Sequence, residues 1–181
     1  MKRRSCLTIV MALVSLMMIT LTGCGKDFEL KSSAFIDANP IPEKYWYTQE
    51  GNISPPFNWV NPPAGTESFA LVMRHPHGAV DRICWAVFNI PADCNEIPEN
   101  ASGKNMPKGS IELINSWRTS GYYGMTPLRG GGTFDWITTV YALNTAVIDD
   151  LAGFKSPLEI DAILAGKVIA EATILGTASR Q

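Results

Sequence analysis

Proline and glycine recur so often in the middle of the chain that its predicted elements are short. The 181 residues include 12 prolines and 15 glycines. Proline lacks a backbone donor and glycine favours turns, so both residues divide a chain into brief segments. The segments between them are rich in β-branched and aromatic residues, which predicts strands. The predicted strands cover residues 69–74, 84–90, 111–115, 136–143 and 167–175.

The clearest helix signal lies late in the chain. Ser156 is typical of an N-cap, Pro157 of a first helical position, and Glu159 stands three residues after the cap. The helix is expected to reach about residue 165 and to end at Gly166. Because strands dominate and the helix comes late, the sequence predicts a mainly β fold in which helices pack at the edge of an antiparallel sheet.

The N-terminus has the pattern of a lipoprotein signal peptide. Residues 2–4 are basic, and residues 7–21 form an apolar stretch that is shorter than the roughly 20 residues of a transmembrane helix. The stretch ends in the sequence LTGC, which resembles the bacterial lipobox and makes Cys24 the expected site of acylation. We expect a signal peptide over residues 1–23, a lipidated tether over 24–33 and one folded domain over 34–181.

Export and lipidation would hold this domain at the cell envelope. Gly25 lacks the aspartate that favours inner-membrane retention in enteric bacteria, so an outer-membrane anchor facing the periplasm is expected. The chain has 15 basic and 17 acidic residues, and signal removal takes away three basic ones, which leaves a net charge of about −5. Nucleic acids and anionic lipid surfaces are bound largely through basic patches, which an acidic domain lacks. We therefore expect membrane contact only through the lipid on Cys24, and we expect no nucleic acid as a partner.

Two cysteines and both histidines remain as candidate functional residues of the exported domain. Cys84 and Cys94 would reach a compartment where a disulfide can persist, and the sequence leaves their pairing open. His75 and His77 flank Pro76, and on an extended backbone their side chains project to the same side. This concentration of imidazole at one point of the chain predicts a site there.

The sequence lacks the common catalytic and cofactor motifs. It has no Gly-x-Ser-x-Gly elbow, P-loop, His-Glu-x-x-His or Cys-x-x-Cys. Cys84 with His75 or His77 is the only nucleophile and base pair on offer, and nothing in the sequence supplies an orienting third group. An enzyme is therefore the least favoured class, and no cofactor is expected.

Six segments of the chain form a recognisable set: GNISPPFNW (51–59), PAGTESFAL (63–71), WAVFNIP (85–91), GYYG (121–124), TVYAL (139–143) and the segment 165–177. These motifs resemble the phosphatidylethanolamine-binding protein family, in particular its bacterial, Raf-kinase-inhibitor-like branch of the YbhB/YbcL type. The resemblance extends from about residue 30 to residue 177, in the family's order. It implies a large antiparallel sheet packed against a smaller sheet, with helices near the C-terminus, and a small surface pocket for an anionic group.

The implied pocket is substituted in this chain. Histidines 75 and 77 replace the two aspartates of the family's Asp-Pro-Asp-x-Pro segment, and Cys84 replaces the histidine before the tryptophan. Met125 lies in a partly kept proline segment, and Phe134 stands where a second histidine is expected. Fold alone is a poor guide to function, so the site must be argued from these residues.

Three interpretations of the substituted pocket remain open. In the first, a binding domain takes a small polar or anionic ligand, such as phosphate or a headgroup, through His75 and His77. In the second, the pocket is degenerate and the domain contacts an envelope protein. In the third, His75, His77 and Cys84 bind copper or zinc, with Met125 as a weak fourth ligand. The expected ligand-binding residues are His75, His77, Cys84, Trp85, Tyr123, Met125 and Phe134, with Trp136 as a further apolar wall.

Two polar residues of the first motif have a simpler expected role. Asn52 and Ser54 precede Pro55 and Pro56, and asparagine and serine side chains often bond nearby backbone in turns. We therefore expect local turn hydrogen bonds from both.

Cys24→Ala is expected to abolish acylation and leave a soluble or unprocessed precursor, because the thiol is the attachment point of the diacylglyceryl group. Metabolic labelling with a fatty acid measures this directly. Equal label on wild type and variant would contradict the lipoprotein interpretation.

Overall fold

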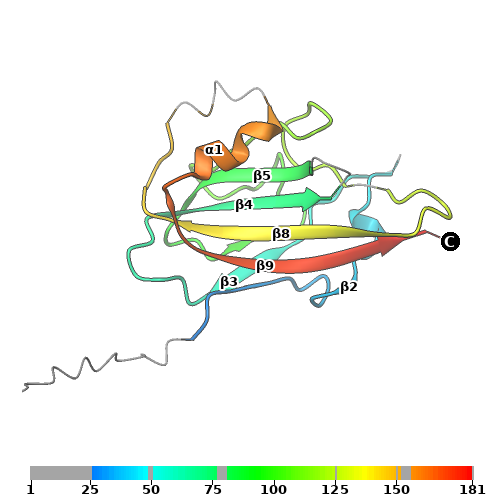
Figure 1. Ribbon diagram of the computed structural model, residues 1–181, viewed down its shortest axis with the longest axis horizontal. Helices are drawn as coiled ribbons and strands as arrows, with labels where there is room; N and C mark the ends of the chain where they lie inside the picture. The colour runs from blue at the N-terminus through cyan, green and yellow to red at the C-terminus, as the bar shows by residue number, and fades with distance from the viewer. Residues whose placement is uncertain are drawn as a thin grey trace, which may run out of the picture.

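The chain folds into two packed β-sheets (Figure 1). The computed structural model describes residues 26–48, 51–76, 81–124, 126–149, 151 and 156–180. Cys24, His77 and Met125 lie outside these residues. The larger sheet has the strand order β2-β9-β8-β4-β5-β7, and the smaller has the order β1-β3-β6. The larger sheet comprises β2 (Asn39–Pro40), β4 (Ser68–His75), β5 (Arg82–Pro91), β7 (Ile111–Glu112), β8 (Thr133–Leu143) and β9 (Val168–Ser179). The smaller sheet comprises β1 (Glu29–Lys31), β3 (Phe57–Val60) and β6 (Glu96–Ile97), and η1 is a short 3-10 helix at Glu43–Tyr45.

Strand β4 shows why the large sheet forms. Its side chains alternate between the two faces, and hydrophobic residues occupy both, as expected of a central strand covered on each side. Phe69, Leu71 and Met73 join the core between the two sheets, whereas Ala70 and Val72 join a second core on the opposite face. The strand pairs antiparallel with both β5 and β8.

The core between the sheets is built around large aromatic side chains. Trp59 comes from the small sheet, and Trp85 and Trp136 from the large one, and each is at most 1% exposed. Both cores consist of residues between Leu30 and Ala178.

The second core lies under the helical segment that is expected near the C-terminus. Turn η3 (Pro157–Glu159) continues into α1 (Ile160–Leu164), which lies beside the large sheet near β5 (Figure 1). The backbone N–H of Leu158 donates to Ser156 Oγ at 3.3 Å, and Gly166 adopts a positive φ of 73° after the helix, so the predicted boundaries are close to those observed. Arg74 ties α1 to β4 through an ion pair with Asp161.

No helix in the described part of the chain has both the length and the apolar character needed to cross a membrane.

The predicted fold class is confirmed, and three details differ. The strand expected at 111–115 stops at Glu112, because the side chain of Asn115 accepts from the N–H of Trp117 and turns the chain away. Strand β2 pairs parallel with β9, in an otherwise antiparallel sheet. Strand β1 lies inside the range predicted as a tether, since Leu30 is buried against the small sheet's core.

Gly176→Ala is expected to lower the free energy of unfolding by about 1–3 kcal/mol, because overpacking a filled core forces strain. A Cβ at this position would collide with the side chain of Ile41, which is 1% exposed. Ile41→Ala removes both Cδ1 and Cγ1, the two atoms that block the space, so the double variant should lose less than the sum of the single losses in urea unfolding. Strictly additive losses would show that the contact with Ile41 is not the cause.

Candidate functional site

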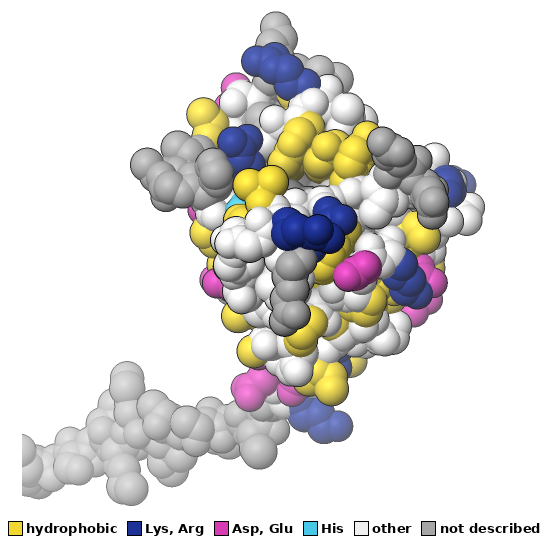
Figure 2. All heavy atoms as spheres, turned by 90° about the vertical axis from the view of Figure 1, so that its right-hand side faces the viewer, with side chains coloured by type: hydrophobic (Ala, Val, Ile, Leu, Met, Phe, Trp, Pro, Cys, Tyr) yellow, Lys and Arg dark blue, Asp and Glu magenta, His cyan; other side chains and the backbone are white. Residues whose placement is uncertain are grey.

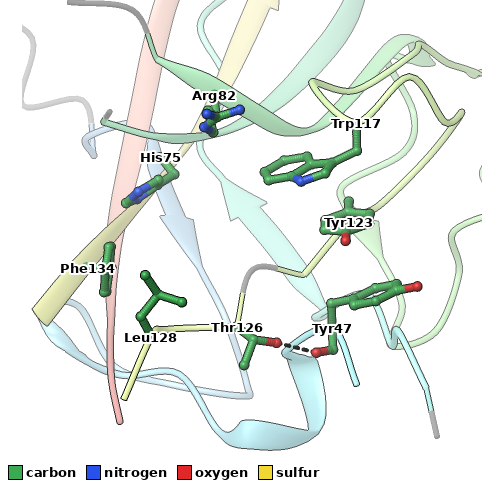
Figure 3. A pocket seen from close by; sticks show the side chains of 8 residues that line it. All are labelled: Tyr47, His75, Arg82, Trp117, Tyr123, Thr126, Leu128 and Phe134. Atoms are coloured by element: carbon green, nitrogen blue, oxygen red, sulfur yellow. Dashed lines mark hydrogen bonds between the residues drawn. The ribbon is translucent and has the colours of Figure 1, made fainter. Parts of the chain in front are cut away.

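A hollow of about 380 Å³ opens at one end of the large sheet, where β4 ends and where β5 and β8 begin. Figure 2 shows this end of the molecule, with hydrophobic side chains gathered around the hollow and Lys and Arg side chains nearby. The volume lies near the lower limit of small-molecule sites, which typically enclose about 300–1,000 Å³. Its lining residues are Tyr47, His75, Arg82, Trp117, Tyr123, Thr126, Leu128 and Phe134 (Figure 3).

One wall of the pocket is a stack of three aromatic rings. Tyr123 lies between Trp117, at a centroid distance of 4.3 Å, and Tyr47, at 4.4 Å, and the interplanar angles are 9° and 13°. The guanidinium carbon of Arg82 lies 5.8 Å from the centroid of the Trp117 ring, within the range of a cation–π contact. Burial in the stack raises the pKa of Tyr123, and the neighbouring Tyr47 adds to this shift, so the Tyr123 ring stays uncharged near neutral pH.

Backbone contacts between two distant segments hold this stack in place. Asn52 donates from Nδ2 to the carbonyl of Tyr122 at 2.5 Å and accepts at Oδ1 from the N–H of Gly124 at 2.7 Å. The carbonyl of Gly124 accepts from the N–H of Tyr47 at 2.7 Å. A Cβ at Gly124 would collide with the backbone oxygen of Tyr45, so only glycine permits this close approach.

The expectation that Asn52 and Ser54 make local turn bonds is therefore wrong. Asn52 bonds residues about 70 positions away, and Ser54 Oγ accepts from the N–H of Ser102 at 3.1 Å. The asparagine satisfies backbone groups of Tyr122 and Gly124, on either side of Tyr123, whose own N–H donates to the carbonyl of Cys84 in β5.

His75, Phe134 and Leu128 form the opposite wall (Figure 3). His75 is 3% exposed, and its ring lies 5.3 Å from the ring of Phe134 between centroids. Its Nδ1 lies 2.9 Å from the carbonyl oxygen of Asp135. A carbonyl can only accept, so Nδ1 carries the hydrogen and donates to the backbone rather than into the pocket.

Arg82 provides the formal positive charge of the pocket. It is the register partner of His75 across the β4–β5 pair, which places the two side chains at the same end of the sheet. Among the described residues, no ion pair involves Arg82, and none of the described lining residues is acidic. The arrangement therefore suits an anion that enters beside an aromatic wall.

The structure brings together only part of the predicted site. His75, Tyr123 and Phe134 line the pocket, whereas His77 and Met125 lie outside the described residues. Cys84, Trp85 and Trp136 are at most 1% exposed and belong to the core between the sheets instead of the pocket wall. The Trp85 indole donates to Glu112 Oε1 at 2.7 Å, on the side of strand β7.

A register shift explains the position of Cys84. Met73 pairs with Trp85 and Arg74 pairs with Ile83, so Cys84 is an extra residue between two pairs. An extra residue of this kind redirects the side chains around it. Cys84 and Trp85 consequently both contribute to the same core, although they are adjacent in a strand.

Burial also changes the chemistry of Cys84. It raises the pKa of the thiol to about 12, with the charge of Arg82 acting in the opposite direction. Cys84 and Cys94 are both free thiols, and Cys94 Sγ donates to the carbonyl of Glu96. Cys84 belongs to the core between the sheets and does not line the pocket, so it is not placed there as the sulfur ligand of the copper or zinc interpretation. No three potential metal ligands cluster among the described residues, which do not include His77.

Three lining residues lie outside every segment that the sequence associated with the pocket: Tyr47, Arg82 and Trp117. Thr126 and Leu128 belong to the partly kept proline segment, of which only Met125 was predicted to bind a ligand. A signal existed for Arg82, because it lies two residues before the strand predicted at 84–90, and His75 directly follows the strand predicted at 69–74. A hairpin of those strands would set the two residues opposite each other. No comparable signal existed for Tyr47 or Trp117, because neither is close in sequence to any predicted site residue.

Fold and pocket together define a two-sheet β domain with a ligand-sized hollow at one end of its large sheet. The family model of phosphatidylethanolamine-binding protein matches residues 31–179. The chain therefore belongs to the phosphatidylethanolamine-binding protein family, as its motifs predicted.

Individual relatives agree with this assignment and with the predicted bacterial branch. A UPF0098 protein of Aquifex aeolicus is 31% identical over 158 residues, which cover 86% of this chain and 91% of that protein. The crystal structure of YbcL from Escherichia coli has the same fold, with a TM-score of 0.78 at 24% identity, covering 86% of this chain and 100% of YbcL. LppC of Mycobacterium tuberculosis, whose name marks it as a candidate lipoprotein, is 31% identical over 119 residues, or 65% of this chain and 56% of LppC.

Only Cys94 is expected to react with Ellman's reagent in the folded domain at about pH 8, because the raised pKa of Cys84 leaves almost no thiolate and the core excludes the reagent. Both thiols should react after unfolding in guanidinium. In a Cys94→Ser variant, a native domain that still reacts at the rate of a free cysteine would contradict the burial of Cys84.

Proposed function

We propose that this chain is an exported, lipid-anchored binding protein that takes a small anionic ligand in the pocket beside Arg82. The observation that carries the proposal is the arginine itself, a cation in a pocket whose described lining has no carboxylate. The mature domain has a net charge of about −5, which repels anions overall. The positive charge of Arg82 opposes this repulsion at the pocket and attracts an anion there.

The neighbours of Arg82 suit it to this role. The ring of Trp117 supports the guanidinium, which restricts its motion and leaves its planar set of donors available for a carboxylate or phosphate. The rings and aliphatic groups beside it bring no negative charge, so the guanidinium dominates the electrostatic attraction that an anion meets in the described lining. His75 contributes to the pocket wall in this arrangement. The hydrogen bond from its Nδ1 to the carbonyl of Asp135 fixes the position of the imidazole ring.

The proposed location rests on the N-terminal sequence. The basic start, the short apolar stretch and the LTGC motif support export and acylation of Cys24. Similarity to LppC is consistent with this interpretation. The domain would then face the periplasm from the outer membrane.

A binding role is favoured over catalysis because of where the reactive groups lie. Cys84, the only nucleophile that the sequence pairs with a histidine, is 1% exposed in the core and has a raised pKa. A nucleophile must reach the substrate together with an adjacent base.

Arg82→Gln is expected to weaken the binding of a small carboxylate or phosphate anion by at least about tenfold, since a charged hydrogen bond contributes about 1.5–3 kcal/mol. Isothermal titration calorimetry on the domain from residue 25 onward measures the change. Lys108→Gln is the matched control, because it removes the same charge from an exposed position that does not line the pocket. Unchanged affinity in the Arg82 variant would reject the proposed site, and absence of any anion binding would favour the protein-contact interpretation.

A further inference from the structure

We infer that the pocket selects a monoanion that carries a flat, apolar group, namely an aryl-bearing carboxylate or phosphodiester, over inorganic phosphate or a bare polar headgroup. The inference rests on the proposed function, because it specifies the ligand of the same site. Three features of the described lining lead to it: its charge, its hydrogen-bond donors and the orientation of its rings.

The charge of the lining matches one negative charge. Arg82 is the only arginine or lysine among the described lining residues, and no acidic residue accompanies it there. A carboxylate or a phosphodiester balances this charge, whereas a phosphate monoester near neutral pH brings close to two negative charges. The excess charge of the monoester would lie against rings and aliphatic groups.

Hydrogen-bond donors are few in the described lining. Thr126 donates its hydroxyl to the carbonyl of Tyr47, and His75 donates from Nδ1 to Asp135. Arg82 is left as the charged donor for a ligand, beside the neutral hydroxyls of Tyr47 and Tyr123 and the indole N–H of Trp117. Inorganic phosphate would bring four oxygens to this single charged donor, and a buried polar atom without a partner is costly.

The apolar walls are shaped for a flat group. Both faces of the Tyr123 ring are covered, by Trp117 and by Tyr47, so this ring can present only its edge to a ligand. Figure 3 shows the stack on one side of the pocket and Phe134 with Leu128 on the other. Ring edges carry partial positive charge and attract the negative face of another ring, so an aryl group between the walls makes edge-to-face contacts.

Calorimetric titration with six small probes tests the inference. The domain from residue 25 onward is titrated with 3-phenylpropionate, methyl phenyl phosphate, acetate, 3-phenylpropanol, inorganic phosphate and phosphoethanolamine. At least one of the two aryl monoanions is expected to bind at least ten times more tightly than acetate, phosphate and phosphoethanolamine, because burial of a phenyl group contributes about this factor. Phenylpropanol, which has the ring without the charge, should also bind at least ten times more weakly. The stronger of the two aryl monoanions tells whether the natural ligand is a carboxylate or a phosphodiester.

Paired variants separate the contribution of the wall from that of the charge. Leu128→Ala should weaken the aryl monoanions severalfold and leave acetate unchanged. Leu128 is 73% exposed, so its truncation spares the core. Leu158→Ala is the control, since this residue is 68% exposed and does not line the pocket.

The possible failures are distinguishable. If phosphate or phosphoethanolamine binds as tightly as the aryl monoanions, and Arg82→Gln weakens all of them, the inference is overturned and the proposed function stands. If no probe binds, or if Arg82→Gln changes nothing, both are overturned.

Discussion

Burial of β4 on both of its faces is the constraint on which the rest of the structure depends. All but one of its eight residues are buried, and its side chains alternate between the two hydrophobic cores. Both faces of the strand must be shielded from solvent, so the small sheet covers one face and α1 covers the other. Strands β5 and β8 pair with its two edges. His75 is the last residue of β4, and the pocket forms beside it at this end of the sheet.

The same packing decides where the predicted site residues lie. Cys84 was expected in the pocket, yet the register shift at this residue places it in the hydrophobic core. The thiol is therefore best understood as a small hydrophobic group, in keeping with its raised pKa. Phe134 behaves differently, because it lies at the beginning of β8, near the end of the sheet, and remains in the pocket wall.

The chemical character of the pocket comes from segments that are far apart in the sequence. Tyr47 follows η1, Trp117 follows a turn after β7, and Tyr123 lies in the loop held by Asn52. Their stacking requires the close approach of two backbones at Gly124, which bonds both Asn52 and Tyr47. Arg82 then contacts the outer ring of the stack, so the position of the only described lining arginine depends on the same arrangement.

The sequence by itself determined the fold class, most strands and the late helix, because these depend on local patterns: side-chain alternation, proline and glycine positions, and a serine cap. Its motifs also determined family membership and indicated His75, Tyr123 and Phe134 as residues near a site. Only the tertiary structure decided that Cys84, Trp85 and Trp136 belong to the core and that Tyr47, Arg82 and Trp117 belong to the pocket. One extra residue in a strand changes the direction of the side chains beside it, and the sequence pattern does not show where such a residue lies. Ring stacking brings together residues that are far apart in the chain, and their spacing follows neither the strand nor the helix period.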